Sequence, residues 1–418
     1  MLKKLILENW KSFRYAELPL DPLTVLIGTN ASGKSNVVEA LEFLQRIANG
    51  ENIETALAGD KTLPAIRGGV EWAARKGVNE FTLKVCLSNN NMDDYLYVIE
   101  LKTVPEILMI EEYIDSYECD TNQITGRYTI NQVNFNIRSG MKRKTRSLDL
   151  GDLKISGIDA IFQNGIQLPI EELDEKFFPG KYKAQDTVLS NLENILIFNP
   201  IPSTMRDYSR LSENLESDGS NIAGVLAALP DDRKTEVENT LSEYIKDLPE
   251  GDIKKVWAEP VGRLKTDAML YCQEEWKPGE ITEIDARSMS DGTLRFLAIL
   301  TALLTRPEGS QIVIEEIDNG LHPSRAALLV KILKEIGSKR NIDILLTTHN
   351  PALLDAFGSE IVPFVVVAHR DSETGESKLT LLEDIENLPL LLASGTLGRL
   401  ATKGAIEKSF SNQKSSRL

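Results

Sequence analysis

One short segment limits the possible folds of this chain more than any other. It follows the mostly apolar run at 23–27, precedes apolar residues at helical spacing, and reads Gly28-Thr29-Asn30-Ala31-Ser32-Gly33-Lys34-Ser35. This is the pattern G-x-x-x-x-G-K-[ST] between a strand and a helix. Glycines let the backbone N–H groups of such a loop point at a phosphate, and the helix start adds partial positive charge. The segment therefore predicts a phosphate-binding loop.

The side chains of this loop have separate expected tasks. Lys34 can reach the β- and γ-phosphates of a nucleotide, and the hydroxyl of Ser35 can ligate Mg²⁺. An amphipathic helix is expected next, ending near Asn49-Gly50, because apolar residues recur on one side at Val37, Val38, Leu41, Leu44 and Ile47. A chance glycine-rich turn is the alternative, and the strand and helix on its two sides argue against it.

Two acids follow a second apolar run. Residues 311–314 are Gln-Ile-Val-Ile, and Glu315 and Glu316 come directly after them. We expect an apolar strand that ends in the two acids, and strand alternation then turns their side chains to opposite faces. We therefore predict that Glu315 ligates Mg²⁺ and that Glu316 acts on the attacking water. Alone, the pair is as readily two solvated acids at a strand end, and the phosphate loop favours the catalytic interpretation.

A histidine follows a third apolar run. His349 lies just beyond the strand expected at 342–346. In a parallel sheet this is the carboxyl edge, where ligands bind. A neutral imidazole there can hydrogen-bond a γ-phosphate. A histidine at a strand end is more often structural, and the neighbouring motifs favour a catalytic role here.

A further helix start carries a second candidate anion site. The residues before the apolar helix expected at 293–304 are Ser290, Asp291, Gly292 and Thr293. Ser290 or Asp291 can cap this helix, and Gly292 leaves backbone N–H groups exposed. Taken alone, the segment is simply a well-capped helix.

The composition excludes several classes of site. With 47 Lys and Arg against 63 Asp and Glu, the formal net charge is −16, which makes the whole chain a poor non-specific polyanion binder. Three separated cysteines and three histidines argue against disulfide frameworks and zinc or His-rich metal sites. No run approaches the roughly 18 apolar residues of a membrane span. We expect a cytoplasmic protein without a membrane partner.

The motifs lie near the two ends of the chain, and a mixed region separates them. That region holds a predicted hairpin (81–101), a strand (128–137) and helices within 210–250, where a capping segment at 218–221 precedes Ile222. The α/β alternation at both ends predicts an α/β fold with a mostly parallel sheet and an α+β insertion. The predicted parts are an N-terminal head segment at 1–50, an insertion with a partner or sensor surface at 51–280, a C-terminal head segment at 281–405 and a flexible tail at 406–418.

Four motifs in fixed order carry a resemblance to known proteins. They are Asn9-Trp10-Lys11-Ser12-Phe13, the loop from Gly28 to Asn36, Ser290-Asp291-Gly292-Thr293-Leu294-Arg295, and Glu315-Glu316-Ile317-Asp318-Asn319-Gly320-Leu321-His322-Pro323. The order of the phosphate loop, the Ser290–Thr293 segment, the acid pair and His349 resembles that of ABC-type ATPase heads. Among these, the chain is similar to the RecF and OLD (overcoming lysogenisation defect) ATPases. Relatives of this kind form the ATPase half of bacterial antiphage systems such as Septu, PARIS and some retron operons. The insertion is covered only weakly, by Arg67-Gly68-Gly69 and 218–221.

The resemblance implies ATP and Mg²⁺ as ligands and a homodimer or higher even oligomer as the assembly. Gly28 to Asn36 of one chain would hold a nucleotide that Ser290 to Thr293 of another chain would cap. Glu315 stands where Asp is usual, which can weaken the geometry around Mg²⁺. Glu316 and His349 would be catalytic.

We therefore expect a slow, regulatory ATPase that dimerises around ATP and controls a separate effector, a nuclease or toxin, in antiphage defence. Residues 350–418 are too few for the nuclease domain of OLD proteins, so effector chemistry is expected from a partner chain. The alternative is a RecF-like, ATP-gated DNA repair clamp. Its nucleic-acid surface would be the basic cluster at 142–146, although the net charge disfavours it. The long insertion disfavours a transporter domain, and the intact motifs disfavour a pseudo-ATPase.

Overall fold

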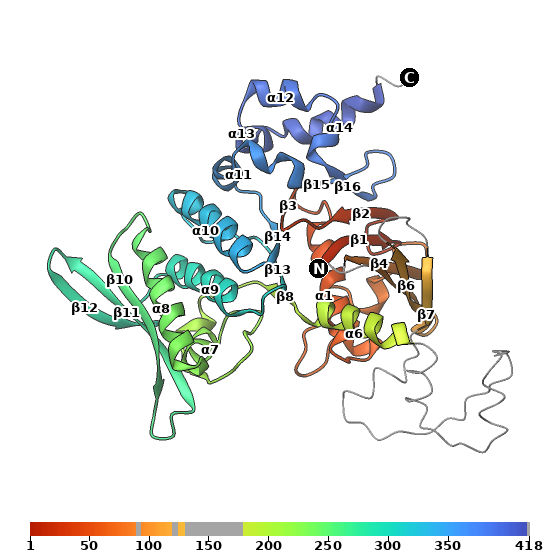
Figure 1. The fold of residues 1–418 in the computed structure, drawn as a ribbon. Helices are drawn as coiled ribbons and strands as arrows, with labels where there is room; N and C mark the ends of the chain where they lie inside the picture. The colour runs from red at the N-terminus through yellow and green to blue at the C-terminus, as the bar shows by residue number, and fades with distance from the viewer. Residues whose placement is uncertain (89–92, 119–123, 130–178, 416–418) are drawn as a thin grey trace, which may run out of the picture.

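The computed structural model describes residues 1–88, 93–118, 124–129 and 179–415. Its strands form three sheets, and Figure 1 shows that one of them lies between the other two. The expected strand at 128–137 is described only as far as Thr129, and the basic cluster at 142–146 lies outside the described residues.

The central sheet carries the candidate site. Its strand order is β16-β15-β3-β14-β13-β8, and all neighbours are parallel except β15 and β16. This confirms the predicted α/β class with a mostly parallel sheet. The strands are β3 (Leu23–Ile27), β8 (Ile195–Phe198), β13 (Gln311–Ile314), β14 (Asp343–Thr347), β15 (Val365–Arg370) and β16 (Ser377–Leu381).

This sheet divides the hydrophobic core into two clusters. Leu26, Val313 and Leu345 belong to the cluster on the side of α1, whereas their neighbours Val25, Ile312 and Ile344 belong to the other. Successive strand residues point to opposite faces, so a strand covered on both faces is apolar throughout. That is why these strands read as unbroken apolar runs in the sequence.

An antiparallel sheet lies on one side of the central sheet, in the order β2-β1-β4-β5-β6-β7. The pairing of β4 with β5 confirms the predicted hairpin. Helix α1 (Lys34–Ala48) and helix α6 (Pro179–Glu193) share one hydrophobic cluster with this sheet. The strands are β1 (Leu2–Glu8), β2 (Tyr15–Pro19), β4 (Glu80–Ser88), β5 (Asp93–Lys102), β6 (Leu108–Glu118) and β7 (Ile124–Thr129), and the short helix α2 (Ile53–Ala58) follows α1.

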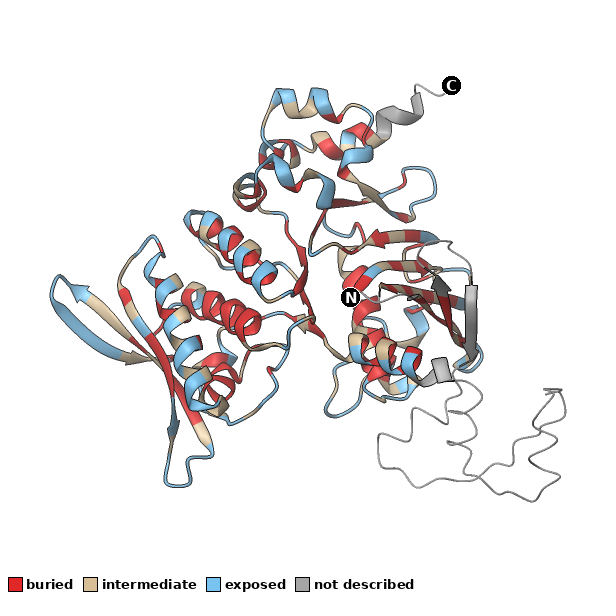
Figure 2. Ribbon diagram, viewed as in Figure 1, coloured by how far each residue is buried: buried red, intermediate tan, exposed pale blue. Residues whose placement is uncertain are grey.

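The other face of the central sheet carries helices and a smaller antiparallel sheet. Helix α9 is buried along most of its length and is largely red in Figure 2, whereas β12, at the outer edge of the smaller sheet, is largely exposed. The helices are α7 (Ile222–Ala228), α8 (Asp231–Lys246), α9 (Asp291–Thr305) and α10 (Ala326–Lys339), and the strands are β9 (Ser209–Arg210), β10 (Ile253–Val261), β11 (Asp267–Lys277) and β12 (Glu280–Asp285).

Three details differ from the sequence predictions. Helix α7 begins after Asn221 as expected, but the Asn221 side chain bonds to Glu216 and Asn214 rather than capping the helix. The apolar run at 362–368, which reads as a strand in the sequence, forms one only from residue 365, because residues 359–364 form a 3-10 helix that contains Pro363. The third difference concerns the C-terminal tail.

The predicted flexible tail is a helix over most of its length. Helix α14 (Ala405–Ser415) follows α11 (Pro351–Phe357), α12 (Leu388–Ser394) and α13 (Leu397–Thr402). Ile406 is buried, and the ring of Phe410 stacks on His369 of β15 at 3.9 Å between centroids. These two apolar residues lie four positions apart, on one helix face, which explains why the segment folds.

The sheets cross the predicted domain boundaries. Strand β8 lies within 51–280 but forms the edge of the central sheet, and β4 to β7 continue the sheet that β1 begins. The division into functional parts stays a prediction. In the part of the chain that the structure describes, no helix has the length and apolar character needed to cross a bilayer.

Candidate nucleotide site

The loop between β3 and α1 has the backbone of a phosphate cradle. Gly28 and Gly33 have φ values of 146° and 112°, a region that favours glycine. A Cβ on Gly28 would lie 2.2 Å from the carbonyl oxygen of Ala368, and a Cβ on Gly33 would lie 2.8 Å from both Phe13 and Ser377. Both glycines are therefore required by conformation and by space.

The ammonium group of Lys34 contacts the backbone of its own loop. Lys34 Nζ donates to the carbonyl oxygens of Gly28 at 2.7 Å and of Thr29 at 3.0 Å. Burial lowers the pKa of Lys34, while the carboxylates of Glu316 and Glu315 oppose that shift. The buried Ser32 Oγ has no hydrogen-bond partner among the described residues. An ammonium with only carbonyl partners and an orphaned hydroxyl both fit a loop built to hold a phosphate.

The N-terminal motif holds the first turn of α1 in place. Trp10 Nε1 donates to the carbonyl oxygen of Asn36 at 2.7 Å, and Asn36 Nδ2 donates to Ser12 Oγ at 2.7 Å. Lys11 Nζ lies 2.5 Å from a carboxylate oxygen of Glu39, and both side chains are 7% exposed. The side chain of Asn36, predicted to bind nucleotide, is thus engaged by Ser12, and its role at the nucleotide stays a prediction.

The acid pair lies directly after β13. Ser35 Oγ donates a hydrogen bond to Glu315 Oε1, so the two predicted Mg²⁺ ligands are adjacent. The prediction that the strand continues through the two acids is wrong, because β13 ends at Ile314 and Glu316 has a φ of 47°. The acids diverge because the chain leaves the strand in a left-handed turn. Strand alternation is not the cause.

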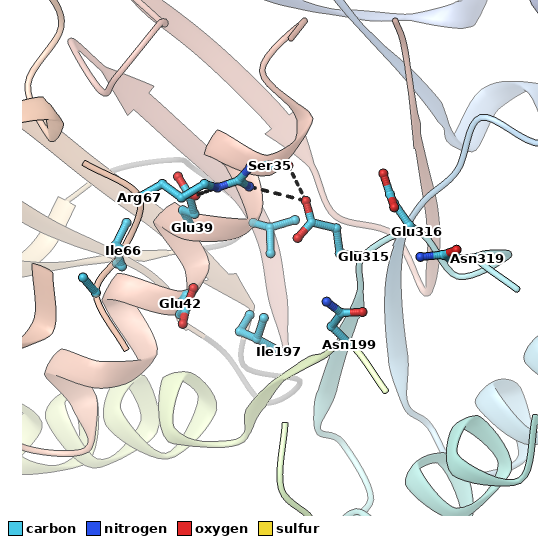
Figure 3. Close-up of a pocket in the computed structure, with 12 residues that line it drawn as sticks. Ser35, Glu39, Glu42, Ile66, Arg67, Ile197, Asn199, Glu315, Glu316 and Asn319 are labelled. Carbon is cyan, nitrogen blue, oxygen red and sulfur yellow. Dashed lines mark hydrogen bonds and ion pairs between the residues drawn. The ribbon is translucent and has the colours of Figure 1, made fainter. Parts of the chain in front are cut away.

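A cavity of about 410 Å³ opens between α1, β8 and the acid pair. In Figure 3 the Glu315 side chain points toward Ser35 and Arg67, whereas Glu316 points another way. The walls are mostly polar or charged, apart from four apolar side chains. They are formed by Ser35, Val38, Glu39, Glu42, Ala65, Ile66, Arg67, Ile197, Asn199, Glu315, Glu316 and Asn319.

Arg67 is a site residue that the sequence analysis did not select. Its Nε lies 2.5 Å from Glu39, and its Nη2 lies 3.7 Å from Glu315. Two thirds of its side chain is exposed, so the guanidinium can change partners without a large desolvation cost. The Arg67-Gly68-Gly69 motif was a signal, but nothing in the sequence places it beside residue 315.

The end of β14 positions the turn that contains Glu316. Thr347 Oγ1 accepts a hydrogen bond from the backbone N–H of Glu316 at 2.8 Å, and Thr348 Oγ1 donates to buried Asp318 at 2.5 Å. His349 comes next, at the carboxyl edge, as predicted. It is exposed and does not line the cavity, so its role stays a prediction.

The predicted second anion site lies at the start of α9. Ser290 caps the helix by accepting a hydrogen bond from the N–H of Thr293 at 3.1 Å. None of the residues 290–293 lines the cavity. Arg295 connects the two regions, because its Nη1 lies 3.4 Å from the carbonyl oxygen of Glu316.

The residues present fit Mg²⁺ bound together with a nucleotide. Among the described residues, no group of three or more His, Cys, Asp or Glu side chains could hold a metal. Mg²⁺ commonly takes one or two protein ligands and completes its shell with phosphates and water. Ser35 and Glu315, side by side at the cavity, meet that requirement.

The phosphate loop joins β3 of a mostly parallel sheet to α1, and the acid pair follows β13, which lies two strands away from β3 in that sheet. This arrangement defines a P-loop ATPase head of the ABC type. Comparison with known proteins agrees. Residues 23–86 and 169–355 match the family described as "AAA domain, putative AbiEii toxin, Type IV TA system". The chain belongs to that family.

Solved structures that the chain matches include heads of SMC proteins. The SMC head domain from Thermotoga maritima is 16% identical, with 91% of this chain and 98% of that chain covered and a TM-score of 0.45. An Smc head from Pyrococcus furiosus, bound to the C-terminal domain of ScpA, is 14% identical, with 94% and 99% covered and a TM-score of 0.47. A comparison with curated protein sequences found no match.

Proposed function

We propose that this protein hydrolyses ATP slowly, dimerises around ATP, and uses that cycle to control a separate effector protein, a nuclease or toxin, in bacterial antiphage defence. One observation supports the proposed dimer. Ser35 at the end of the phosphate loop and the acid pair line one cavity, whereas the capped helix start at 290–293 does not. A single chain therefore offers two separate phosphate-binding elements, and a second copy would bring one against the other.

The residues of the candidate nucleotide site have distinct roles in this proposal. Lys34 and the loop N–H groups hold the β- and γ-phosphates, and Ser35 with Glu315 would hold Mg²⁺. Bound Mg²⁺ supplies polarisation of the phosphoryl oxygens. Glu316 orients the attacking water and accepts its proton, a role that suits a carboxylate held by its backbone on Thr347.

Effector control is preferred over a DNA clamp for two reasons. The net charge of −16 disfavours a nucleic-acid groove, and the family description names a toxin system. A RecF-like clamp remains the alternative. Fluorescence anisotropy with duplex DNA, measured across a salt series, separates the two: salt-sensitive binding that requires ATP would favour the clamp.

The dimer is tested in a variant that binds ATP without turning it over. Glu316→Gln keeps the shape of the side chain but accepts a proton poorly. With ATP and Mg²⁺, this variant should double its mass in light scattering, and the double variant Lys34→Ala/Glu316→Gln should not. A monomer under all conditions contradicts the dimer.

The defence role is tested in cells that carry this chain with its neighbouring reading frame. Phage plating should fall with the parent sequence and recover with Lys34→Ala. Equal plating with the two sequences, across a panel of phages, contradicts a defence role that depends on ATP.

A further inference from the structure

Two arginines surround the start of α9, and neither was selected from the sequence. Arg206 precedes the helix by more than 80 positions, and Arg325 follows it. Both approach Ser290–Gly292, the segment predicted to cap a nucleotide. These arginines either support phosphate binding at that segment or only stabilise the packing of the chain around it.

Arg206 shapes the chain that leads into the helix. Its Nη1 donates to the carbonyl oxygens of Ala286, Arg287 and Met289 at 3.1, 3.0 and 2.8 Å, and its Nη2 lies 2.5 Å from Asp291. A carboxylate at a helix start competes with a phosphate for the same N–H groups. Arg206 offsets the charge of Asp291, which reduces that competition.

Arg325 lies behind the glycine of the segment. A Cβ on Gly292 would lie 2.9 Å from Arg325 Nη1 and 3.2 Å from the carbonyl oxygen of Gly320. Gly292 does not have a left-handed φ. A side chain at 292 would therefore press on the guanidinium and on the Gly320 carbonyl oxygen, and the backbone conformation there does not itself call for glycine.

One edge of this guanidinium has no partner. The Arg325 side chain is 7% exposed; its Nε and Nη2 lie 3.2 and 3.0 Å from Glu250 Oε1. Among the described residues Nη1 has no acceptor, and it is buried. Leaving a charged donor unsatisfied is costly, so such a group calls for an explanation. Here the unsatisfied edge faces the N-terminus of a 15-residue helix, where an anion is favoured.

We propose that Arg325 is a positioning residue for a phosphate site at the start of α9. Its guanidinium adds positive charge directly behind the N–H groups of Gly292 and Thr293, and Arg206 neutralises the acid in front. The ligand is the terminal phosphate of a nucleotide held by the phosphate loop of a second copy. This inference rests on the proposed ATP-bound dimer.

The variants are chosen to separate charge from folding. Arg325→Gln alone would leave Glu250 without its partner, so the main variant is Arg325→Gln/Glu250→Gln, which removes both charges together. Glu250→Gln alone is the matched control, because it breaks the ion pair and keeps the guanidinium. Arg325→Lys/Glu250→Gln restores a cation at the same place.

Steady-state ATP turnover and binding of a fluorescent ATP analogue to the monomer are then measured. The main variant should lose about tenfold in kcat, a size typical of charges near buried helix termini, with analogue binding unchanged. Glu250→Gln should not lower kcat, and the Lys variant should recover part of the loss. If Glu250→Gln lowers kcat as much as the main variant, the ion pair alone matters and the inference is wrong.

Mixing experiments show on which chain Arg325 acts. The main variant keeps its phosphate loop and Lys34→Ala keeps its α9 start, so a mixed dimer contains one intact composite site and activity should return. The positive control mixes Ser290→Arg with Lys34→Ala. Recovery in the control but not with the main variant overturns the inference and leaves the proposed function standing. No recovery in either mixture overturns both.

Discussion

Ser35 and Glu315 form a hydrogen bond although 280 positions separate them in the chain. Ser35 lies in the first turn of α1, after the loop that follows β3, and Glu315 follows β13. Strand β14 lies between β3 and β13 in the sheet, so the two residues meet at its carboxyl edge across one intervening strand. This contact joins the phosphate loop to the acid pair.

The ammonium of Lys34 should dominate nucleotide affinity. Lys34→Ala leaves the loop carbonyls of Gly28 and Thr29 without their donor and removes the counter-charge for the phosphates. We expect ATP affinity to fall by more than about tenfold, as for loss of a charge-assisted contact. Calorimetric titration measures this, with Lys61→Ala on an exposed loop as the control. Equal affinity in both variants would contradict the phosphate-loop assignment.

The carboxylate of Glu315 should set the Mg²⁺ requirement. Glu315→Gln keeps an acceptor for Ser35 but removes the charge beside the expected ion. We expect half-maximal turnover to need about tenfold more Mg²⁺, the scale of one lost charged contact. Glu283→Gln, on exposed β12, is the control. An unchanged Mg²⁺ titration would exclude Glu315 as a metal ligand.

The indole of Trp10 should stabilise both the fold and the loop. Trp10→Phe keeps an aromatic ring beside Phe43 and Phe81 but removes the hydrogen bond to the carbonyl oxygen of Asn36. Loss of that bond and of buried ring volume should lower the free energy of unfolding by about 2 kcal/mol. Trp276→Phe is the control, since Trp276 is 74% exposed. Equal urea midpoints for the two variants would show that the hydrogen bond from Trp10 does not hold the first turn of α1 in place.

A buried carboxyl in the antiparallel sheet should make stability depend on pH. Burial raises the pKa of Glu112 to about 7, although the hydrogen bond from Tyr97 opposes the shift. Because the pKa of Glu112 is raised in the folded state, the contribution of its protonated carboxyl to stability is complete below the unfolded pKa of 4.5. That contribution is lost as pH rises toward 7. The loss is on the order of 3 kcal/mol.

The substitution Glu112→Gln removes this titration. The variant should therefore gain stability relative to the parent at pH 8 more than at pH 5. Urea midpoints at the two pH values measure the difference, with exposed Glu111→Gln as the control. A pH profile of the Glu112→Gln variant that parallels the parent profile would show that Glu112 does not titrate in this range.

Part of the site could be predicted because its geometry is local. The loop from 28 to 35 needs glycines at particular backbone angles, and the strand before it and helix after it have their own apolar patterns. Arg67 and Asn199 could not be predicted as cavity residues, because they reach the cavity through loops whose paths depend on packing against distant elements. The turn that separates the two acids could not be predicted for the same reason, since Thr347 of another strand holds the turn that follows β13.

By itself, the sequence determined the class of the sheet, the phosphate loop and the capped start of α9, because short-range backbone preferences and apolar periodicity are encoded within a few residues. The tertiary structure alone decided which side chains meet. It placed Ser35 against Glu315, turned the unpaired edge of Arg325 toward Gly292, and folded the C-terminal segment onto His369. Those contacts join parts of the chain that are far apart, and they form only when the burial of both hydrophobic clusters holds the sheets and helices in register.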